Sequence, residues 1–306
     1  MGDLATEFEA ERAHLTALAH RMLGSRAEAE DAVQETWLRC ADALADPTAR
    51  AQVRELPAWL TTVCARICLD VLRSARHRRE SYPGPWLPEP VVTPLPDGFA
   101  PDPAERVARA EQVGTALLVL LERLTPEQRV ALVLHDVFAV PFDTVADVLR
   151  TTPAAARQLA SRARRAVDAD GVPRHHADRA EQRRVVEAFQ AAVETGELAE
   201  LLRVLAPDVV LIGDGGGYVP ATRRPIVGAA AVARFLLGVY GPDGRYRGRT
   251  RLRWALVDGT VGVYGEALHR DGRTIRMVVS FAVHDGRITG LFNLLNPEKL
   301  TRLPPL

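Results

Sequence analysis

The sequence has little of several residue types that would have pointed to a particular class of protein. Its three cysteines, Cys40, Cys64 and Cys68, are too few and too badly placed for a disulfide framework. Cys64 and Cys68 lie one helical turn apart, but no histidine, cysteine or acid joins them at the spacing of metal ligands. No apolar run approaches the roughly 18 residues of a membrane-spanning helix, and the acidic N-terminal segment lacks the layout of a signal peptide. We therefore expect a cytoplasmic protein that binds no metal or other cofactor.

Lysine is almost absent, because Lys299 is the only one and arginine supplies the other basic residues. The formal net charge of +0, with 47% hydrophobic and 25% charged residues among 306, is typical of a soluble protein of two or three domains. The charge is nevertheless segregated. Residues 66–79 contain five arginines against Asp70, and residues 151–167 contain four arginines and no acid. Two short basic stripes on a balanced chain match the local phosphate contacts of a nucleic-acid-binding protein.

The first eighty residues have the periodicity of amphipathic helices, beginning with Leu4 to Leu23. In "GSRAEAEDAVQETWLRC", Ser25 as N-cap and Glu28 three residues later predict the start of a second helix. Its buried face is expected to comprise Val33, Trp37, Leu38 and Ala41. "LPAWLTTVCARICLDVLRSARHRR" predicts another helix, which begins near Pro57. Its outward face is expected to carry Thr61, Thr62, Arg66, Arg73 and Arg76.

A second helical region follows, with a helix expected from Pro103 to Arg123 and a capping box of Thr125 and Gln128 after it. "FDTVADVLRTTPAAARQLASRARRAV" then predicts a helix, a short turn and a second helix capped by Thr152. The alanines of that second helix would let it cross the first closely. Its other faces carry Arg157, Gln158, Ser161, Arg162 and Arg165. This pattern indicates a helix-turn-helix, although any amphipathic helix pair with surface arginines would share it.

The periodicity changes after Gly171–Val172–Pro173. Two helices, near 180–195 and 198–205, precede "DVVLIGDGGG", and a third is expected over 229–240. Four alternating runs then follow, separated by Asp-Gly pairs, which favour hairpin turns. Helices followed by a meander of four strands predict a separate α+β domain.

"AEDAVQETWLR" followed by "AWLTTVCARICLDVLR" and the helix-turn-helix resembles the extracytoplasmic-function sigma factors of RNA polymerase. The resemblance implies that the first helix binds core polymerase; a solvated charged face is the alternative. The residues that it implies for this contact are Asp31, Gln34, Glu35, Trp37 and Arg39.

The same resemblance implies promoter DNA as the second partner. The next helix would hold the opened minus-ten element by base stacking and phosphate contacts, through Arg54, Trp59, Thr61, Thr62, Arg66, Arg73 and Arg76. Trp59 fits a core position equally well. The helix-turn-helix would read the minus-thirty-five element, through Arg157, Gln158, Ser161, Arg162, Arg164 and Arg165.

"WLPEP", "DGGG" and "NPEKL" further resemble the sigma factors with a fused C-terminal SnoaL-like domain of the cone-shaped fold. The resemblance implies that this domain docks on the linker through Trp86, Leu87, Pro88, Glu89, Pro90, Asp214, Gly215, Gly216, Gly217, Asn296, Pro297 and Lys299. Two positions depart from the subgroup. Tyr218 replaces the usual lysine, which puts a role for a cation at that loop in doubt, and Glu298 replaces an aspartate conservatively.

The linker itself has eight prolines within residues 81–103, which exclude a helix or a central strand. A stiff segment of this kind loses little entropy on docking; the alternative is a simple spacer. The expected organisation is a multi-domain chain of two all-α sigma domains and an α+β domain. Region 2 spans 1–80, the linker 81–103, region 4 104–170 and the SnoaL-like domain 178–300.

The C-terminal domain leaves three functional hypotheses open. The first is a sigma factor that this domain regulates in cis, without enzymatic activity. The second is a sigma factor whose domain senses a small ligand. The third is a domain that retains cyclase or isomerase activity, for which the residues to inspect are Asp214, Tyr264, Glu266, His269, Arg276 and His284.

Overall fold

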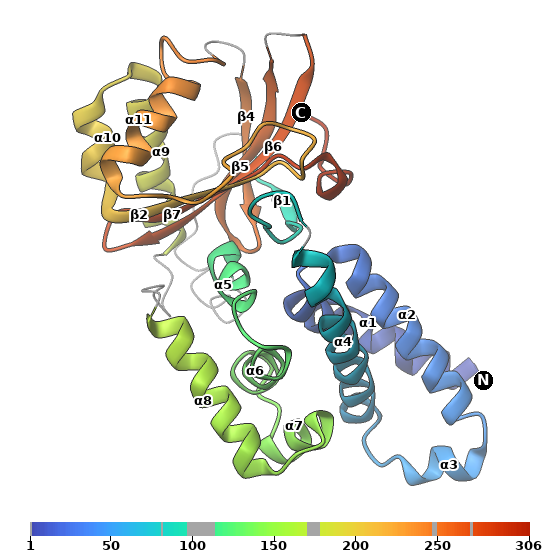
Figure 1. Cartoon of the computed structure of the whole chain (residues 1–306). Helices are drawn as coiled ribbons and strands as arrows, with labels where there is room; N and C mark the ends of the chain where they lie inside the picture. Colours follow the sequence, from blue (N-terminus) through green and yellow to red (C-terminus); the bar gives the residue numbers. More distant parts are fainter. Residues whose placement is uncertain (1, 81, 97–113, 170–177, 247–249, 270–271) are drawn as a thin grey trace. The chain divides into compact units, whose positions relative to one another are not determined.

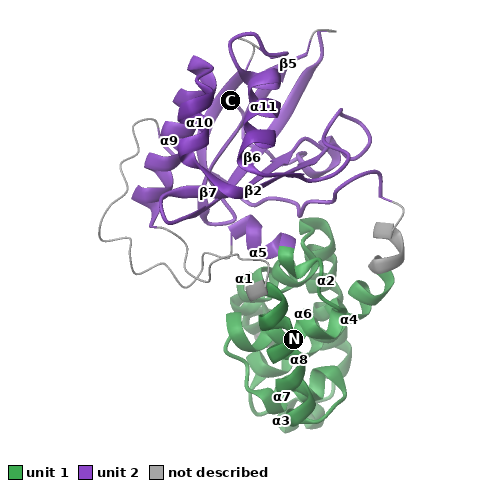
Figure 2. Ribbon diagram, turned by 60° about the vertical axis from the view of Figure 1, so that its left-hand side comes forward, with its two compact units in different colours: residues 1–81, 120–170 green, residues 82–119, 171–306 purple. Residues whose placement is uncertain are grey.

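The computed structural model describes residues 2–80, 82–96, 114–169, 178–246, 250–269 and 272–306 (Figure 1). The chain forms two compact units (Figure 2). The first comprises residues 1–81 and 120–170, and the second comprises residues 82–119 and 171–306. The proline-rich linker therefore belongs to the same unit as the C-terminal domain. Within the described ranges, no helix is both long and apolar enough to cross a membrane.

The first unit is helical throughout. Its N-terminal part contains α1 (Gly2–Leu23), α2 (Arg26–Ala43), α3 (Pro47–Gln52) and α4 (Leu56–Glu80). Ser25 caps α2, because its side chain accepts a hydrogen bond from the amide of Glu28 at 3.3 Å. Leu38 does not join the core as expected, since it is 55% exposed. It follows Gln34 by four residues and Asp31 by seven, so it lies on the polar face of α2.

The second part of this unit contains α6 (Pro126–Leu132), the π-helical turn η2 (Val133–Val137), α7 (Phe142–Leu149) and α8 (Pro153–Ala169). The capping box of Thr125 and Gln128 is present. Arg150, in the left-handed conformation, is the C-cap of α7, and the amide of Ala155 donates to Thr152 Oγ1 at 3.2 Å. Ala156, Ala160 and Ala163 are buried. The predicted helix-turn-helix is therefore formed by α7 and α8.

The second unit is built on one sheet of seven described strands in the order β1-β4-β5-β6-β7-β2-β3. Its strands are β1 (Val92–Pro94), β2 (Leu205–Asp214), β3 (Ile226–Val227), β4 (Thr250–Val257), β5 (Thr260–Leu268), β6 (Thr274–His284) and β7 (Arg287–Leu294). The predicted meander is β4 to β7, whose neighbours pair antiparallel, whereas β2 runs parallel to β7. The turn residues Asp258–Gly259 and Asp285–Gly286 all have positive φ, as Asp-Gly hairpins require. The α+β fold is confirmed.

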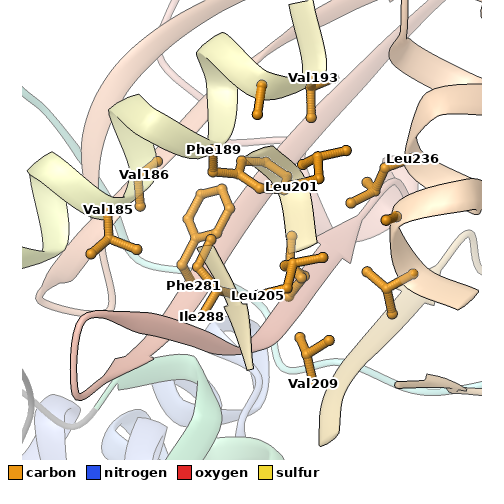
Figure 3. Packing of buried hydrophobic residues seen from close by; sticks show 14 of the residues in the cluster. Val185, Val186, Phe189, Val193, Leu201, Leu205, Val209, Leu236, Phe281 and Ile288 are labelled. Atoms are coloured by element: carbon orange, nitrogen blue, oxygen red, sulfur yellow. The ribbon is translucent and has the colours of Figure 1, made fainter. Parts of the chain in front are cut away.

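The two faces of this sheet have different cores because successive side chains alternate between them. Helices α9 (Arg179–Thr195), α10 (Leu198–Val204) and α11 (Ala229–Tyr240) cover one face. There, Phe189 of α9 packs on Phe281 with ring centroids 5.5 Å apart (Figure 3). On the other face, Leu87 of the linker packs into a cluster that includes Ala255 and Tyr264.

The linker is followed by α5 (Gly114–Leu121), and the boundary between the units falls inside this helix. Ala116 of α5 belongs to the same apolar cluster as Leu87. The helix was expected to begin at Pro103, and that start lies outside the described residues. The described part of the linker and the first residues of α5 thus both pack in the C-terminal fold.

Candidate functional site

The carboxylate of Asp214, at the end of β2, is the centre of a polar cluster that we call the linker cradle (Tyr82, Leu87, Asp214, Asn296 and Lys299). The Asp214 side chain is fully buried. Its Oδ1 accepts hydrogen bonds from Tyr82 OH at 2.6 Å and from the Gly216 amide at 2.9 Å. Its Oδ2 accepts the amide of Leu87 at 2.9 Å. Burial and the bond to Asp214 raise the pKa of Tyr82 far above its usual value, so the phenol stays protonated and donates.

Lys299, the single lysine of the sequence, completes the cradle. Its Nζ lies 2.7 Å from Asp214 Oδ2 and 2.6 Å from the carbonyl oxygen of Leu87. It also lies 4.1 Å from the ring centroid of Trp86 and 4.8 Å from that of Tyr82. The Lys299 side chain is only 13% exposed. A buried ion pair with these additional partners is stable as a pair, whereas either charge alone would be costly there.

Asn296 connects the linker to the turn that presents Lys299. Its Nδ2 donates to Tyr82 OH at 2.8 Å, and its Oδ1 accepts the amide of Glu298 at 3.0 Å. Gly216 has a φ of 60°, and a Cβ at this position would lie 2.4 Å from Asn296 Cγ. A Cβ at Gly215 would lie 2.0 Å from the carbonyl oxygen of Val219. The "DGGG" segment therefore needs glycine so that its backbone can pass directly beneath Asn296.

The two positions that depart from the subgroup pattern contact each other. Tyr218 OH donates to Glu298 Oε1 at 2.6 Å, and both side chains are exposed. This hydrogen bond raises the pKa of Tyr218 above its usual value. The positive charge at this loop is supplied by Lys299 of the neighbouring turn, so the absence of lysine at position 218 does not leave Asp214 without a cation.

A second attachment of the linker centres on Asp258, in the turn between β4 and β5. Its Oδ1 accepts the amide of Val91 at 3.0 Å, and its own amide donates to the Val91 carbonyl at 2.9 Å. Its Oδ2 accepts Thr115 Oγ1 at 2.7 Å. β1 pairs with β4, and the Leu95 amide donates to the Trp254 carbonyl at 3.0 Å. Sequence analysis did not predict the linker contacts of Asp258 and Tyr82. An Asp-Gly hairpin turn already explains Asp258, and no motif near Tyr82 points to its contact with Asp214.

The other residues expected at this interface differ in burial. Leu87 is 1% exposed and Pro88 is also buried. Trp86, Glu89 and Pro90 are half-buried. Gly217 is exposed, but a Cβ there would lie 2.9 Å from Pro83 Cγ. Pro297 is exposed and opens the short 3₁₀ turn η3 (Pro297–Lys299) that presents Lys299.

The expected polymerase-binding residues lie on α2. Asp31, Gln34 and Arg39 are exposed, and Glu35 is half-buried and pairs with Arg39 at 2.9 Å. Trp37 is half-buried, and its ring centroid lies 5.1 Å from that of Phe8 in α1. Leu38 lies between these polar residues and was missed. Its exposed side chain gives the face an apolar centre, which is the usual composition of a protein-binding surface.

The expected minus-ten residues lie in or just before α4, and one of them is corrected by the structure. Thr61 does not face outward but is 7% exposed, because it follows buried Leu60 and lies one turn before Ala65. Arg54 is exposed, whereas Trp59 and Thr62 are half-buried, and Thr62 Oγ1 donates to the Ala58 carbonyl at 2.9 Å. The side chain of Arg76 lies outside the described residues.

Two arginines of α4 contact the second helical part of the same unit. Arg66 Nη2 donates to the Asp147 carbonyl at 3.0 Å, and Arg66 Nε is buried without a partner among the described residues. Arg73 donates to Glu127 Oε1 at 3.0 and 3.1 Å. In this conformation, both guanidinium groups that were expected to hold DNA phosphates are engaged within the protein.

The expected minus-thirty-five residues lie on α8. Arg157, Gln158, Arg162 and Arg165 are exposed, and Ser161 is half-buried. The Arg157 guanidinium lies 5.7 Å from the ring centroid of Phe142. Arg164 forms two bonds with the carboxylate of Asp136, at 2.6 and 2.7 Å. In this conformation Arg164 therefore fixes α8 against η2, and the phosphate contact expected of it stays a prediction.

Arg129 of α6 joins the two helical parts from inside the core. It is 3% exposed, and its guanidinium donates to the carbonyls of Leu121 and Met22, each at 2.9 Å. It also pairs with Glu122 at 2.7 Å. Burial lowers the pKa of Arg129 to about 9, so the group is still charged at neutral pH. The carbonyl of Met22 belongs to the last turn of α1, which favours a cation.

A cavity of about 850 Å³ lies in the second unit beneath α9 and α11. The six residues inspected for catalysis, Asp214, Tyr264, Glu266, His269, Arg276 and His284, are all outside its lining. Asp214 belongs to the linker cradle, and Arg276 donates to the carbonyls of Leu300, Leu303 and Pro304. Within the part of the chain that the structure describes, no three His, Cys, Asp or Glu side chains form a group suited to a metal ion.

Three known protein families match the chain. Sigma-70 region 2 matches residues 8–78, Sigma-70 region 4 matches residues 115–167, and the SnoaL-like domain matches residues 186–291.

Full-length relatives cover the same three regions. The chain is 46% identical over 315 residues to the ECF RNA polymerase sigma factor SigJ of Mycobacterium tuberculosis (strain ATCC 25618 / H37Rv), covering 98% of this chain and 94% of the relative. It is 32% identical to the probable ECF RNA polymerase sigma factor SigI of Mycobacterium tuberculosis (strain CDC 1551 / Oshkosh), covering 98% and 96%. The crystal structure of Mycobacterium tuberculosis SigJ matches with a TM-score of 0.75 and 43% identity, over 97% of this chain and 98% of that one. The chain therefore belongs to the ECF RNA polymerase sigma factors and is one of those that carry a C-terminal SnoaL-like domain.

Proposed function

We propose that the chain binds core RNA polymerase, directs transcription initiation at promoters with minus-ten and minus-thirty-five elements, and is regulated in cis by its C-terminal domain. Membership of the ECF sigma factors supports the first two activities. The observation that carries the regulatory part is the buried Asp214–Lys299 pair, which closes on the backbone of Leu87. This work would take place in the cytoplasm, where the polymerase and the promoter are.

The exposed face of α2 is the proposed polymerase contact, with Leu38 at its centre and Asp31, Gln34 and Glu35 around it. The proposed DNA contacts are Arg54, Trp59, Thr62, Arg66 and Arg73 for the opened strand, and Arg157, Gln158, Ser161, Arg162 and Arg165 for the duplex. Arg66 and Arg73 must first leave Asp147 and Glu127. DNA binding and separation of the two helical parts are therefore coupled in this proposal.

We further propose that the C-terminal domain regulates without catalysing a reaction. General acid–base catalysis needs a titratable group within hydrogen-bond reach of the substrate. Glu194 has the sole carboxylate side chain among the residues that line the cavity, and it is exposed. The remaining polar lining is made of arginine, amide, hydroxyl and phenol groups.

Replacing Arg162 by alanine should weaken binding to a cognate minus-thirty-five duplex by about 1–3 kcal/mol, because a bidentate guanidinium–guanine contact has that value. Discrimination against a duplex with one altered base pair should fall as well. Arg203→Ala, at an exposed position of α10, is the matched control and should change neither quantity. Equal losses on all sequences, with a smaller salt dependence, would assign Arg162 to phosphate instead.

Leu87→Asp should release the linker, since Leu87 is 1% exposed and a carboxylate cannot remain in that apolar cluster. In transcription assays with core polymerase, we expect output from a cognate promoter to change by about fivefold or more. Thr93→Asp is the control, because Thr93 lies in the same linker and is exposed. Identical output from Leu87→Asp, Thr93→Asp and the native chain would refute regulation through the docked linker.

A further inference from the structure

The side chain of Arg157, on the exposed side of α8, lies over an aromatic ring of the preceding helix. α7 packs beside α8 in the helix-turn-helix (Figure 1), and its first residue is Phe142. The guanidinium carbon of Arg157 lies 5.7 Å from the centroid of the Phe142 ring, which is within the range of a cation–π contact. This contact orders a side chain that is otherwise exposed to solvent.

Phe142 is in turn supported by His135 of the π-helical turn η2. The two rings are stacked, with centroids 3.8 Å apart and an angle of 27° between their planes. Nδ1 of His135 lies 3.0 Å from the carbonyl oxygen of Val140. A carbonyl can only accept a hydrogen bond, so Nδ1 carries the proton and this bond fixes the orientation of the imidazole. We call His135 and Phe142 the aromatic support of Arg157.

The backbone between η2 and α7 positions the aromatic support. Ala139 has a φ of 54°, which a residue with a Cβ rarely adopts. It lies between η2 and α7, where it turns the chain so that the carbonyl of Val140 faces His135. Asp136, the next residue of η2, binds Arg164 of α8 through both carboxylate oxygens, at 2.6 and 2.7 Å. Adjacent residues of one π-helical turn therefore contact α7 and α8, and such turns are frequent at functional sites.

Order of this kind matters for an arginine that reads a base. A long side chain loses conformational entropy when a complex immobilises it, and a side chain that is ordered in advance loses less. A bidentate contact with guanine also requires the planar guanidinium to take one orientation relative to the base edge. An aromatic ring packed against the guanidinium limits the orientations that are available to it in the free protein. Its effect should therefore be greater on base discrimination than on contacts with phosphate.

We propose that Arg157 reads one guanine of the minus-thirty-five element and that His135 and Phe142 are positioning residues, which order its guanidinium before DNA binds. In the complex, the guanidinium donates to O6 and N7 of that guanine while it stays packed on the Phe142 ring. The inference rests on the proposed reading of the minus-thirty-five element by α8. It adds a base that Arg157 selects and two residues outside α8 on which this selection depends.

Equilibrium binding of the full chain to a set of duplexes tests this inference. The set comprises the cognate minus-thirty-five element, selected from randomised duplexes, and variants in which each base pair is changed in turn. Phe142→Leu keeps an apolar side chain but removes the flat ring, so it should lower discrimination at one G·C pair about fivefold. Arg157→Ala should abolish discrimination at the same pair, and adding Phe142→Leu to it should cause no further loss there. Phe142→Tyr keeps the ring and should retain native discrimination.

Phe138→Leu is the matched control. Phe138 is half-buried in the same connection between η2 and α7, and its ring centroid lies 5.1 Å from the guanidinium carbon of Arg21 in α1. The substitution removes the same kind of contact, but to an arginine of α1 instead of α8. The ratio of affinities for the altered and the cognate duplexes should therefore stay within about twofold of the native ratio at every base pair.

A second variant and a measurement without DNA keep the test open if Phe142→Leu fails to fold. His135→Asn removes the stacked imidazole but retains a donor for the Val140 carbonyl, and it should lower discrimination at the same G·C pair about threefold. In the full chain with isotope-labelled arginine, the Nε–H proton of Arg157 is assigned by its loss in Arg157→Lys. The ring current of Phe142 should displace this resonance upfield, and His135→Asn should reduce the displacement.

Native discrimination by folded Phe142→Leu, or by His135→Asn where only that variant folds, would overturn the inference. An equal loss at every base pair would also overturn it, because it would indicate a general effect on the helix-turn-helix. So would a further loss at the same G·C pair in the double variant. A native chain that binds all duplexes equally would instead refute the proposed reading of the minus-thirty-five element. Since Arg162→Ala tests that reading independently of the aromatic support, the two failures are distinguishable.

Discussion

Asp214→Asn is expected to lower the free energy of unfolding of the C-terminal unit by about 3 kcal/mol and to release the linker. The substitution keeps the shape of the side chain but removes its charge, which leaves Lys299 buried without a counter-ion. Breaking a buried ion pair by removing one partner typically costs about 3–5 kcal/mol. The amide also turns one acceptor oxygen into a donor nitrogen, which cannot accept the bond of the Leu87 amide or of Tyr82 OH.

Two measurements check this expectation. Chemical denaturation gives the stability, and chymotrypsin digestion reports on the linker, because the bond between Trp86 and Leu87 is accessible to the protease only when the linker is released. Asp208→Asn, on the same strand but exposed, is the matched control. Adding Lys299→Met to Asp214→Asn should recover part of the loss, since no unpaired charge then remains. If Asp214→Asn is as stable and as resistant as Asp208→Asn, the cradle does not hold the linker.

Leu38→Asp is expected to weaken binding of the chain to core RNA polymerase by about 100-fold. Leu38 is 55% exposed in the free protein, so the substitution should change the folded state little. In the proposed complex, a carboxylate at the centre of the interface would be desolvated without a partner, and losses of 2 kcal/mol or more are usual for such central positions. Equilibrium titration of labelled protein with core polymerase measures the effect.

Ala43→Asp provides the control for Leu38→Asp. Ala43 is exposed on the same helix, five residues further along, and therefore points to a different side. It should leave polymerase affinity within about twofold of the native value. If both variants bind as the native chain does, the exposed face of α2 is not the contact. If both lose affinity equally, the effect is one of general charge and does not identify Leu38 as a central residue.

Much of the fold could be predicted because it depends on residues close together in sequence. The Ser25 cap, the Thr125–Gln128 capping box and the alanine face of α8 each act within one or two helical turns. The Asp-Gly turns of the meander are equally local. At the linker, the motifs "WLPEP", "DGGG" and "NPEKL" contain Leu87, Asp214 and Lys299, which the structure brings within hydrogen-bond distance of one another. Only the resemblance to other chains had connected the three motifs.

What could not be predicted depends on contacts between distant residues. Periodicity predicted an outward position for Thr61 and an inward one for Leu38. A helix of mixed composition allows more than one boundary between its faces, and the packing of α1, α2 and α4 on one another decides between them. Arg164 looked like any other arginine of α8 until Asp136, 28 residues away, was seen to pair with it. The Asp-Gly turn alone accounted for an aspartate at position 258, so the sequence offered no reason to predict the bonds of Asp258 to Val91 and Thr115.

β1 and the first residues of α5 belong to the C-terminal fold. The segment that connects the two halves of the helical unit is therefore held by the C-terminal domain. A free chain spanning residues 82–119 would have a root-mean-square end-to-end distance of about 35 Å and could extend much further. In the proposed mechanism, the C-terminal domain sets the local concentration at which the two halves proposed to bind DNA meet, in the same way that linker length sets avidity in bivalent binders. Promoters that differ in the spacing between their two elements should therefore differ in how much their transcription changes when the C-terminal domain releases the linker.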